Sequence, residues 1–289
     1  MNATALFDEP GPRTRRRHKI IEIVSGAAIV ALAVWVVAAL SAHGVFSVSA
    51  WSPFAQWGLW QLLGTGLVNN ITAAAVAMIL SMLVGYLLAF GLLSPNTVLR
   101  YSCQGFTAIF NSIPVLLLLF FTSLMLPSWG LQFSDFWFLV FALTLYSGAV
   151  IGDLIRAGVQ ALPHGQSEAA TALGFSPTRT LQLVLLPQAL RSMSPALVSQ
   201  LVIIFKGTSL AYVLGGYVEL LHSATLIGAY YSQSALQALS VAAVLFMLVN
   251  IGLAAMAKAI ERREQRRYGL QSTSGDSSEL MGLDPARRV

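Results

Sequence analysis

Residues 64–93 read GTGLVNNITAAAVAMILSMLVGYLLAFGLL, a stretch without a charged side chain. About 20 mostly apolar residues are enough for a helix to cross the hydrocarbon layer of a membrane. Across all 289 residues, 56% are hydrophobic and 10% are charged, whereas ordinary soluble domains carry about 25% charged residues. The chain lacks the polar side chains that a soluble surface needs. The sequence therefore predicts an integral membrane protein and excludes a soluble globular enzyme.

Six apolar runs predict an all-α membrane protein with about six transmembrane helices. The expected spans are Ile23–Leu40, Gly64–Leu93, Phe106–Leu126, Phe136–Ile155, Pro195–Tyr217 and Ala235–Ala257. Pro127 is expected to end the third span, because proline breaks a helix. The expected organisation is a basic N-terminal segment (1–22), a first span with an external loop (23–60), a core of five spans (61–260) and a disordered tail rich in Ser, Gly and charge (261–289).

The distribution of basic residues predicts the orientation in the membrane, because short cytoplasmic loops are enriched in Lys and Arg. These residues gather on one side of the spans: Arg13, Arg15, Arg16, Arg17, Lys19, Arg100, Arg156, Arg179, Arg191, Lys258, Arg262, Arg263, Arg266 and Arg267. The opposite segments contain no Lys or Arg and carry Trp and Tyr side chains typical of a membrane interface. Both termini are therefore expected in the cytoplasm. A cleavable signal peptide is the alternative interpretation of the first run, and it leaves the other five spans in the same orientation.

The longest cytoplasmic connection, residues 162–191, reads LPHGQSEAATALGFSPTRTLQLVLLPQALR and predicts two short helices. Gly174 can take the left-handed conformation that stops the first helix. Ser176 is expected to cap the second helix, with Pro177 at its first position and Pro187 at its end. Compact helices with small residues under a membrane are expected to dock another protein.

Several blocks in this region carry a resemblance to a known family. The blocks are Glu168-Ala169-Ala170, Gly174 after three further residues, and Leu186-Pro187-Gln188-Ala189-Leu190. Their spacing resembles the EAA loop of permease subunits in type I ATP-binding-cassette (ABC) importers. The flanking blocks 155–163 and 206–210 are similar to the polar amino acid subfamily, which includes glutamate, glutamine, histidine and arginine importers, and glutamate-type permeases are the most similar. The resemblance covers about residues 60 to 260.

The resemblance implies a mechanism with several partners. Two permease subunits, identical or different, would pair in the bacterial cell membrane and place their EAA loops on a cytosolic ATPase dimer. The coupling residues implied are Glu168, Ala169, Ala170, Gly174, Leu186 and Pro187. ATP-driven closure of the ATPase would open the pathway outward, so that an extracytoplasmic amino-acid-binding protein delivers its load. ATP and Mg are expected on the partner ATPase, with no cofactor on this chain.

The fifth span carries three polar candidates for the substrate pathway or its gate, Lys206, Thr208 and Ser209. A lysine inside a span is costly unless it pairs or faces a polar cavity, so snorkelling and an ion pair are the structural alternatives. Glu219 is a further candidate. It is expected near the outer surface, where it either contacts the binding protein or is solvated.

The third and fourth spans carry the remaining candidates. Asp153 and Arg156 are three residues apart on one helix face, and an ion pair between them is expected as a structural clamp. Asn111, Ser112 and Pro114 belong to a block in which the subfamily usually has arginine at the position of Asn111. Without that arginine, recognition of a substrate carboxylate or anchoring of a helix is left to another group, such as one from a partner permease.

Other classes of chemistry have no support in the sequence. It contains no GxxxxGK[ST], HExxH or GxSxG motif, so neither ATP binding nor hydrolysis is expected on this chain. The single cysteine, Cys103, excludes an internal disulfide and a CxxC metal site, so no metal is expected. The one-sided net charge of +5 favours anionic lipid over nucleic acid.

The expected function is therefore uptake of polar amino acids, glutamate or aspartate first, by a transporter subunit that is not an enzyme. One alternative is a permease for another amino acid or an opine. The other is an ATP-independent secondary carrier, which predicts ion-coupling carboxylates or an internal repeat.

Overall fold

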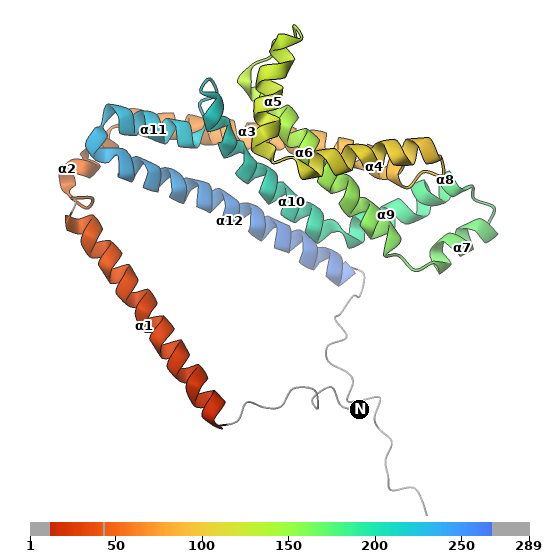
Figure 1. Cartoon of the computed structure of the whole chain (residues 1–289), viewed down its shortest axis with the longest axis horizontal. Coiled ribbons are helices and arrows are strands. Elements are labelled where there is room, and N and C mark those ends of the chain that lie inside the picture. Colours follow the sequence, from red (N-terminus) through yellow and green to blue (C-terminus); the bar gives the residue numbers. More distant parts are fainter. Residues whose placement is uncertain (1–11, 43, 268–289) are drawn as a thin grey trace, which may run out of the picture.

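The computed structural model describes residues 12–42 and 44–267, and every regular element within them is a helix (Figure 1). The long helices are α1 (Pro12–Ala42), α3 (Trp57–Leu92), α6 (Asp135–Gln160) and α12 (Ala235–Arg267). Helix α10 (Ser194–Gly207) continues as the 3-10 helix η4 (Thr208–Leu214), and together they form a fifth stretch able to cross a membrane. A bent pair, α4 (Thr97–Ser112) and α5 (Val115–Ser128), brings the number to six if it counts as one span. The all-helical prediction with about six spans is confirmed.

The third span is not the straight helix expected from Phe106 to Leu126. Helices α4 and α5 meet at an angle of 104°. Ile113 is extended, with φ −87° and ψ 125°, because a residue before proline is pushed out of the helical region. Pro127 does not end the span either, since α5 continues to Ser128. The break therefore lies at Pro114, where proline lacks the N–H that a continuous helix needs.

Helices α3 and α6 run side by side and make the most extensive contact of the fold. Glycines allow their backbones to approach. A Cβ atom added at Gly85 of α3 would lie 2.7 Å from the Cβ of Ile151 and 3.1 Å from the carbonyl oxygen of Gly148. On α6, Gly148 and Gly152 are four residues apart, the spacing of a GxxxG contact in membrane helices. Close van der Waals packing thus stabilises the centre of the molecule.

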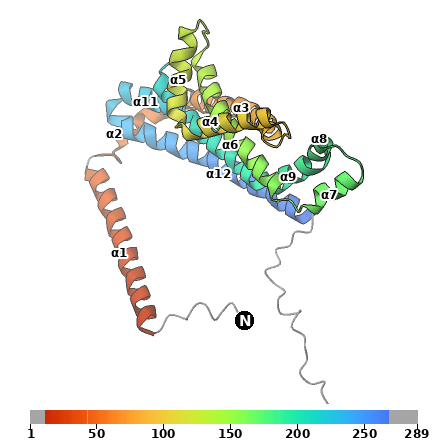
Figure 2. The ribbon, with the colours of Figure 1, turned by 45° about the vertical axis from the view of Figure 1, so that its right-hand side comes forward.

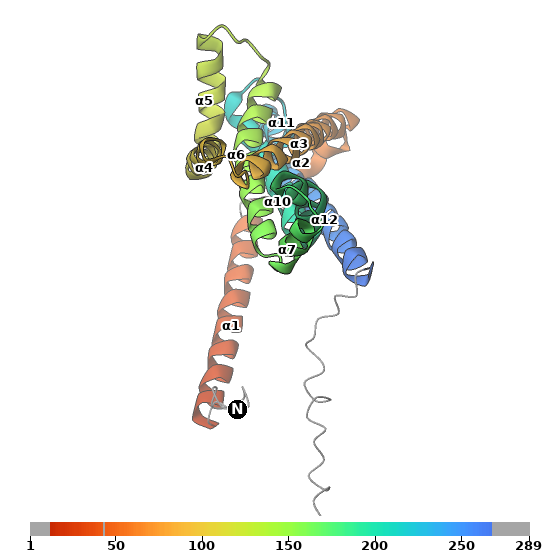
Figure 3. The ribbon, with the colours of Figure 1, turned by 90° about the vertical axis from the view of Figure 1, so that its right-hand side faces the viewer.

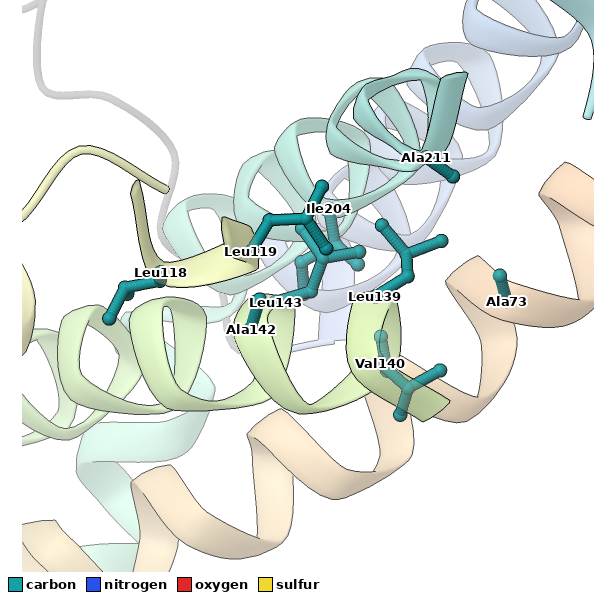
Figure 4. Close-up of a cluster of buried hydrophobic side chains, with 10 residues drawn as sticks. Ala73, Leu118, Leu119, Leu139, Val140, Ala142, Leu143, Ile204 and Ala211 are labelled. Carbon is teal, nitrogen blue, oxygen red and sulfur yellow. The ribbon is translucent and has the colours of Figure 1, made fainter. Parts of the chain in front are cut away.

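A buried apolar cluster fills the space where α3, α5, α6 and α10 meet (Figure 4). Leu139 and Leu143 of α6 face Ile204 of α10 and Leu119 of α5. Small residues on α3, including Ala73 and Ala77, complete the cluster without holding the helices apart. The N-terminal part of α5 packs in this cluster. Its C-terminal part, at the top of Figure 3, stands away from the other helices.

The segment between the last two spans, expected to be an external connection, contains helix α11 (Leu220–Tyr230) and a short 3-10 turn, η5 (Ser232–Ser234). With 11 residues, α11 is too short to cross a bilayer alone. It packs against α3 through Leu63, Ala224 and Ile227. Two further short helices, α2 (Val48–Trp51) and η2 (Ser52–Ala55), precede α3.

Helix α1 stands apart from the other helices in all three views of the ribbon (Figures 1, 2 and 3). Its large apolar side chains are exposed, for example Trp35 at 66%. At the other end of the chain, α12 continues to Arg267, past the expected core boundary at residue 260. The N-terminal segment 1–11 and the remainder of the expected tail, 268–289, lie outside the described residues.

Candidate functional site

The first half of the 162–191 segment folds as predicted. Helix α7 (Gly165–Ala172) carries Glu168 in its first turn, where the carboxylate complements the helix dipole. Glu168 and Ala169 are exposed, whereas Ala170 is buried. Gly174 follows the helix with φ +81°, the left-handed conformation that glycine adopts at little cost. The acidic, small-residue face of α7 is thus open at the surface.

The second half of the segment extends further than predicted. Helix α8 (Pro177–Thr180) leads into a π-helical stretch, η3 (Leu181–Leu185), and then into α9 (Leu186–Ser192). Pro187 lies at the start of α9, so the expected end of the helix at this residue is wrong. Proline is tolerated because it lies in the first turn of α9, where its missing N–H is not needed. The stretch directly before it is π-helical, with hydrogen bonds between residues five apart.

The 162–191 segment is tied to the membrane helices through its buried side chains. Leu186 is 1% exposed and packs with Ile151 and Ile155 of α6. A side-chain hydrogen bond from Gln188 Nε2 to Gln166 Oε1, 3.2 Å long, links α9 to α7. In Figure 1, α7, α8 and α9 lie together at one end of the helical body. Helix α7 is therefore connected to α6 through α9.

The candidates Asn111 and Asp153 are brought together. Asn111 Nδ2, at the end of α4, donates a hydrogen bond of 2.7 Å to Asp153 Oδ2 on α6. No ion pair between Asp153 and Arg156 forms within the described residues, so the expected clamp is wrong. Ser112 Oγ donates instead to the Ala108 carbonyl within its own helix. The Asn111–Asp153 bond joins α4 to α6 just before the break at Pro114.

A second polar contact, which the sequence did not predict, joins α3 to the segment that follows α10. Asn70 is fully buried, and its Nδ2 donates to Thr208 Oγ1 at 2.8 Å while its Oδ1 accepts from the Leu220 N–H at 2.9 Å. Asn69 Nδ2 donates to the Val218 carbonyl at 2.8 Å. We refer to these contacts of Asn69 and Asn70 as the asparagine clasp. The signal available in the sequence was an adjacent amide pair within an apolar run.

Glu219 has a different role from the one expected. It is buried rather than solvated, and its carboxylate accepts hydrogen bonds from the N–H groups of Leu221 and His222 at 2.8 and 2.7 Å. Glu219 is therefore the N-cap of α11. Burial raises the pKa of this carboxyl, which lies between the spans, while the two backbone donors act in the opposite direction.

The three candidates at the end of α10 fall in different environments. Thr208 is buried and held by Asn70. Ser209 lines an apolar cleft of about 180 Å³ between η4, α11 and α12. Lys206 is exposed in the last turn of α10. The structure therefore does not gather Asn111, Asp153, Lys206 and Glu219 into one cluster of contacts.

In the described part of the chain, no three His, Cys, Asp or Glu side chains are close enough to hold a metal ion. What the fold presents is a helical membrane body with a short helical segment exposed at one end. This combination defines an all-helical membrane protein with several spans.

The family of the chain follows from its similarity to known proteins. Residues 81–266 match the family described as binding-protein-dependent transport system inner membrane component. This match covers more than half of the sequence, so the chain belongs to that family. Its relatives are permease subunits of transport systems, and the chain is accordingly a transporter subunit and not an enzyme.

Three relatives illustrate the similarity. The chain is 37% identical over 228 residues to the glutamate transport system permease protein GluD of Corynebacterium glutamicum, covering 78% of this chain and 83% of that protein. It is 32% identical over 208 residues to the probable glutamine ABC transporter permease protein GlnP of Bacillus subtilis, covering 70% and 93%. It is 33% identical over 171 residues to the glutamate/aspartate import permease protein GltK of Escherichia coli, covering 56% and 76%.

Solved structures support the fold. A chain from an amino acid ABC transporter crystallised with histidines aligns with a TM-score of 0.65 at 24% identity, covering 70% of this chain and 94% of that one. A chain from the inward-facing MetNI methionine ABC transporter aligns with a TM-score of 0.62 at 19% identity, covering 72% and 99%. At these identities the likeness shows a shared ABC permease fold.

Proposed function

We propose that this permease imports polar amino acids, with glutamate or aspartate as the leading substrate. The observation that carries the proposal is the 37% identity to a glutamate permease over most of both chains. A glutamate/aspartate permease at 33% identity supports the same substrate class. Permeases named for glutamine and arginine also match, so a permease for another amino acid or an opine is the competing proposal.

The 162–191 segment is the proposed docking site for an ATPase. The exposed carboxylate of Glu168 would meet basic groups on the ATPase, and the exposed Ala169 would allow close approach. The buried residues Ala170 and Leu186 and the half-buried Pro187, with the turn at Gly174, hold α7 and α9 in place for this contact. ATP and Mg bind to the ATPase in this scheme. Both termini and this segment lie in the cytoplasm of the bacterial cell.

Transport requires further partners. Two permease subunits, identical or different, form the pathway between them in the cell membrane, and an extracytoplasmic binding protein delivers the amino acid. Binding of ATP closes the ATPase pair and shifts the permeases toward an outward-open state. The proposed lining or gating residues are Asn111, Ser112, Pro114, Asp153, Lys206, Thr208 and Ser209. Glu219, the remaining candidate, is buried and caps α11 instead.

Purification from the native membrane in mild detergent tests the assembly. Recovery of an ATPase with a phosphate-binding loop and of a second permease chain, or a homodimer, is the expected result. Transport by the chain alone after reconstitution without ATP would instead establish a secondary carrier. Competition of labelled glutamate uptake by unlabelled aspartate, glutamine, arginine and opines then ranks the substrates.

Glu168→Arg tests the docking site. This substitution places a positive charge where the ATPase is proposed to present basic groups, and we expect the ATPase to dissociate and uptake to be lost while the permease stays folded. The matched control is Glu22→Arg, which makes the same charge change at an exposed site on α1. Normal uptake by Glu168→Arg would contradict the proposed contact.

A further inference from the structure

Lys206 presents an unusual environment for a charged side chain. It lies in the last turn of α10, within the apolar stretch Ser194–Leu214, and its side chain is exposed on the isolated chain. A lysine facing lipid hydrocarbon is strongly disfavoured, because the ammonium group loses its hydration. The side chain must therefore meet a polar group in the assembled membrane complex.

No partner for Lys206 exists within residues 12–42 and 44–267. The Glu219 carboxylate is engaged with the first turn of α11, and Asp153 accepts its hydrogen bond from Asn111. No ion pair joins Lys206 to these or to any other described carboxylate. The first structural alternative, a pairing within the subunit, is thereby removed.

Snorkelling does not account for Lys206 either. The residue follows the start of α10 by 12 residues, which corresponds to about 18 Å along the helix axis. In the other direction η4 adds seven residues, or about 14 Å at the rise of a 3-10 helix. A four-carbon stem is too short to bring the ammonium group to either end of the stretch.

The face of α10 that carries Lys206 differs from a lipid-facing surface. Ser199, Ile203 and Lys206 share one helix face and are exposed, whereas the opposite face is buried. On the central part of α12, from residue 241 to 257, the exposed positions carry no polar side chain, as in Met247, Leu248 and Ile251. A face with a hydroxyl and an ammonium group is suited to a polar pathway, while the α12 surface is suited to lipid.

The backbone next to Lys206 is fixed. A side chain at Gly207 would collide with Leu143 of α6, so α10 and α6 are in close contact at this point. Thr208 follows and is held by the clasp through Asn70. A single charged group on a fixed backbone can recognise a ligand of opposite charge with little loss of conformational freedom.

We propose that Lys206 is a carboxylate-binding residue of the translocation pathway and takes the α-carboxylate of the transported amino acid. This inference rests on the proposed function, because an amino acid supplies the carboxylate. The α-carboxylate is common to all amino acids, so Lys206 would contribute affinity while other groups select the side chain. An ammonium–carboxylate bond at a site with little water is stronger than the same bond in bulk solvent.

Equilibrium binding to the purified permease–ATPase complex, without the binding protein, tests the inference. Labelled L-glutamate and its α-carboxamide, which lacks the α-carboxylate charge, are titrated against wild type, Lys206→Gln, Lys206→Arg and Lys258→Gln. We expect Lys206→Gln to weaken glutamate binding at least about tenfold. Lys206→Arg should retain most of the affinity, and Lys258→Gln, which removes an exposed lysine near the end of α12, should bind as wild type.

The α-carboxamide separates recognition from a general defect. It should bind weakly to wild type and equally weakly to Lys206→Gln, so that the preference for glutamate disappears in the variant. Unchanged glutamate binding by Lys206→Gln would overturn the inference, as would an equal loss for both compounds. Dissociation of the two permease subunits by Lys206→Gln, measured by size-exclusion chromatography, would overturn it in favour of an ion pair between subunits.

Failure of the proposed function has a different signature. In that case the wild-type complex binds neither L-glutamate nor its α-carboxamide, although it retains its ATPase. If wild type and Lys206→Gln bind glutamate equally well, the result supports the proposed function and contradicts the proposed binding of the α-carboxylate by Lys206.

Discussion

Helix α3 makes two contacts of opposite character. In its C-terminal third it meets α6 through glycines, and this contact depends on the complementary shapes of the two helices. Ser81 Oγ is buried there without a hydrogen-bond partner among the described residues. Eleven residues earlier in the sequence, Asn70 holds Thr208 and the N–H of Leu220 by hydrogen bonds. Packing therefore stabilises two regular helices against each other, whereas polar side chains hold the irregular backbone after α10, whose peptide groups need partners.

The first prediction breaks the packed contact. Gly85→Leu would place a side chain against Ile151 and the Gly148 carbonyl, where no space exists. Overpacking that forces the backbone to move typically costs about 1–3 kcal/mol and occasionally more, and we expect a cost at the upper end of this range for a side chain as large as leucine. The purified variant is heated and then analysed by size-exclusion chromatography. We expect its monodisperse peak to disappear at a clearly lower temperature than that of wild type.

Gly64→Leu is the matched control for this substitution. Gly64 lies on the same helix, but a Cβ there meets nothing within 4 Å. Equal loss of stability in both variants would mean that leucine disturbs α3 by itself and that the contact with α6 is unimportant.

The second prediction breaks the clasp. Asn70→Ala leaves the buried Leu220 N–H without its acceptor and removes the donor to Thr208. An orphaned buried amide costs about 1–3 kcal/mol, so the thermal midpoint should fall by less than in Gly85→Leu. Asn69→Ala removes one bond, to the Val218 carbonyl, from a half-buried site and should cost less than Asn70→Ala. An equal effect of the two variants would contradict the central role of Asn70.

The two contacts also differ in how far the sequence could predict them. Length and hydropathy were sufficient for the spans, because a membrane helix depends mainly on a run of apolar residues. The GxxxG spacing of Gly148 and Gly152 is visible in the printed sequence and could have predicted a close helix contact. The clasp could not be predicted, because the partners of Asn70 lie 138 and 150 residues further along the chain.

Three other differences have local or tertiary causes. The break at Pro114 has a signal in the sequence, but the apolar character of the surrounding run outweighed it. Helix α11 is too short for a search based on span length. The burial of Glu219 arises because α3 covers it beside Gly66, a long-range contact that the local sequence does not reveal. In the 162–191 segment, by contrast, Gly174 and Pro177 determine the turn and the helix start locally, and both were predicted correctly.

The third prediction has the smallest expected effect and sharpens the comparison. It uses two substitutions, each of which removes one hydroxyl group from one of the two contacts. Ser81→Ala deletes an unpartnered buried hydroxyl and leaves the shape of the α3–α6 contact almost unchanged. Its free energy of unfolding should therefore stay within about 0.5 kcal/mol of wild type or rise slightly. Thr208→Val, of similar shape, deletes the acceptor for Asn70 and should be measurably destabilising. A loss in Ser81→Ala as large as in Thr208→Val, measured by the same thermal assay, would mean that the Ser81 hydroxyl is bonded in the membrane and that the packed contact also depends on polar groups.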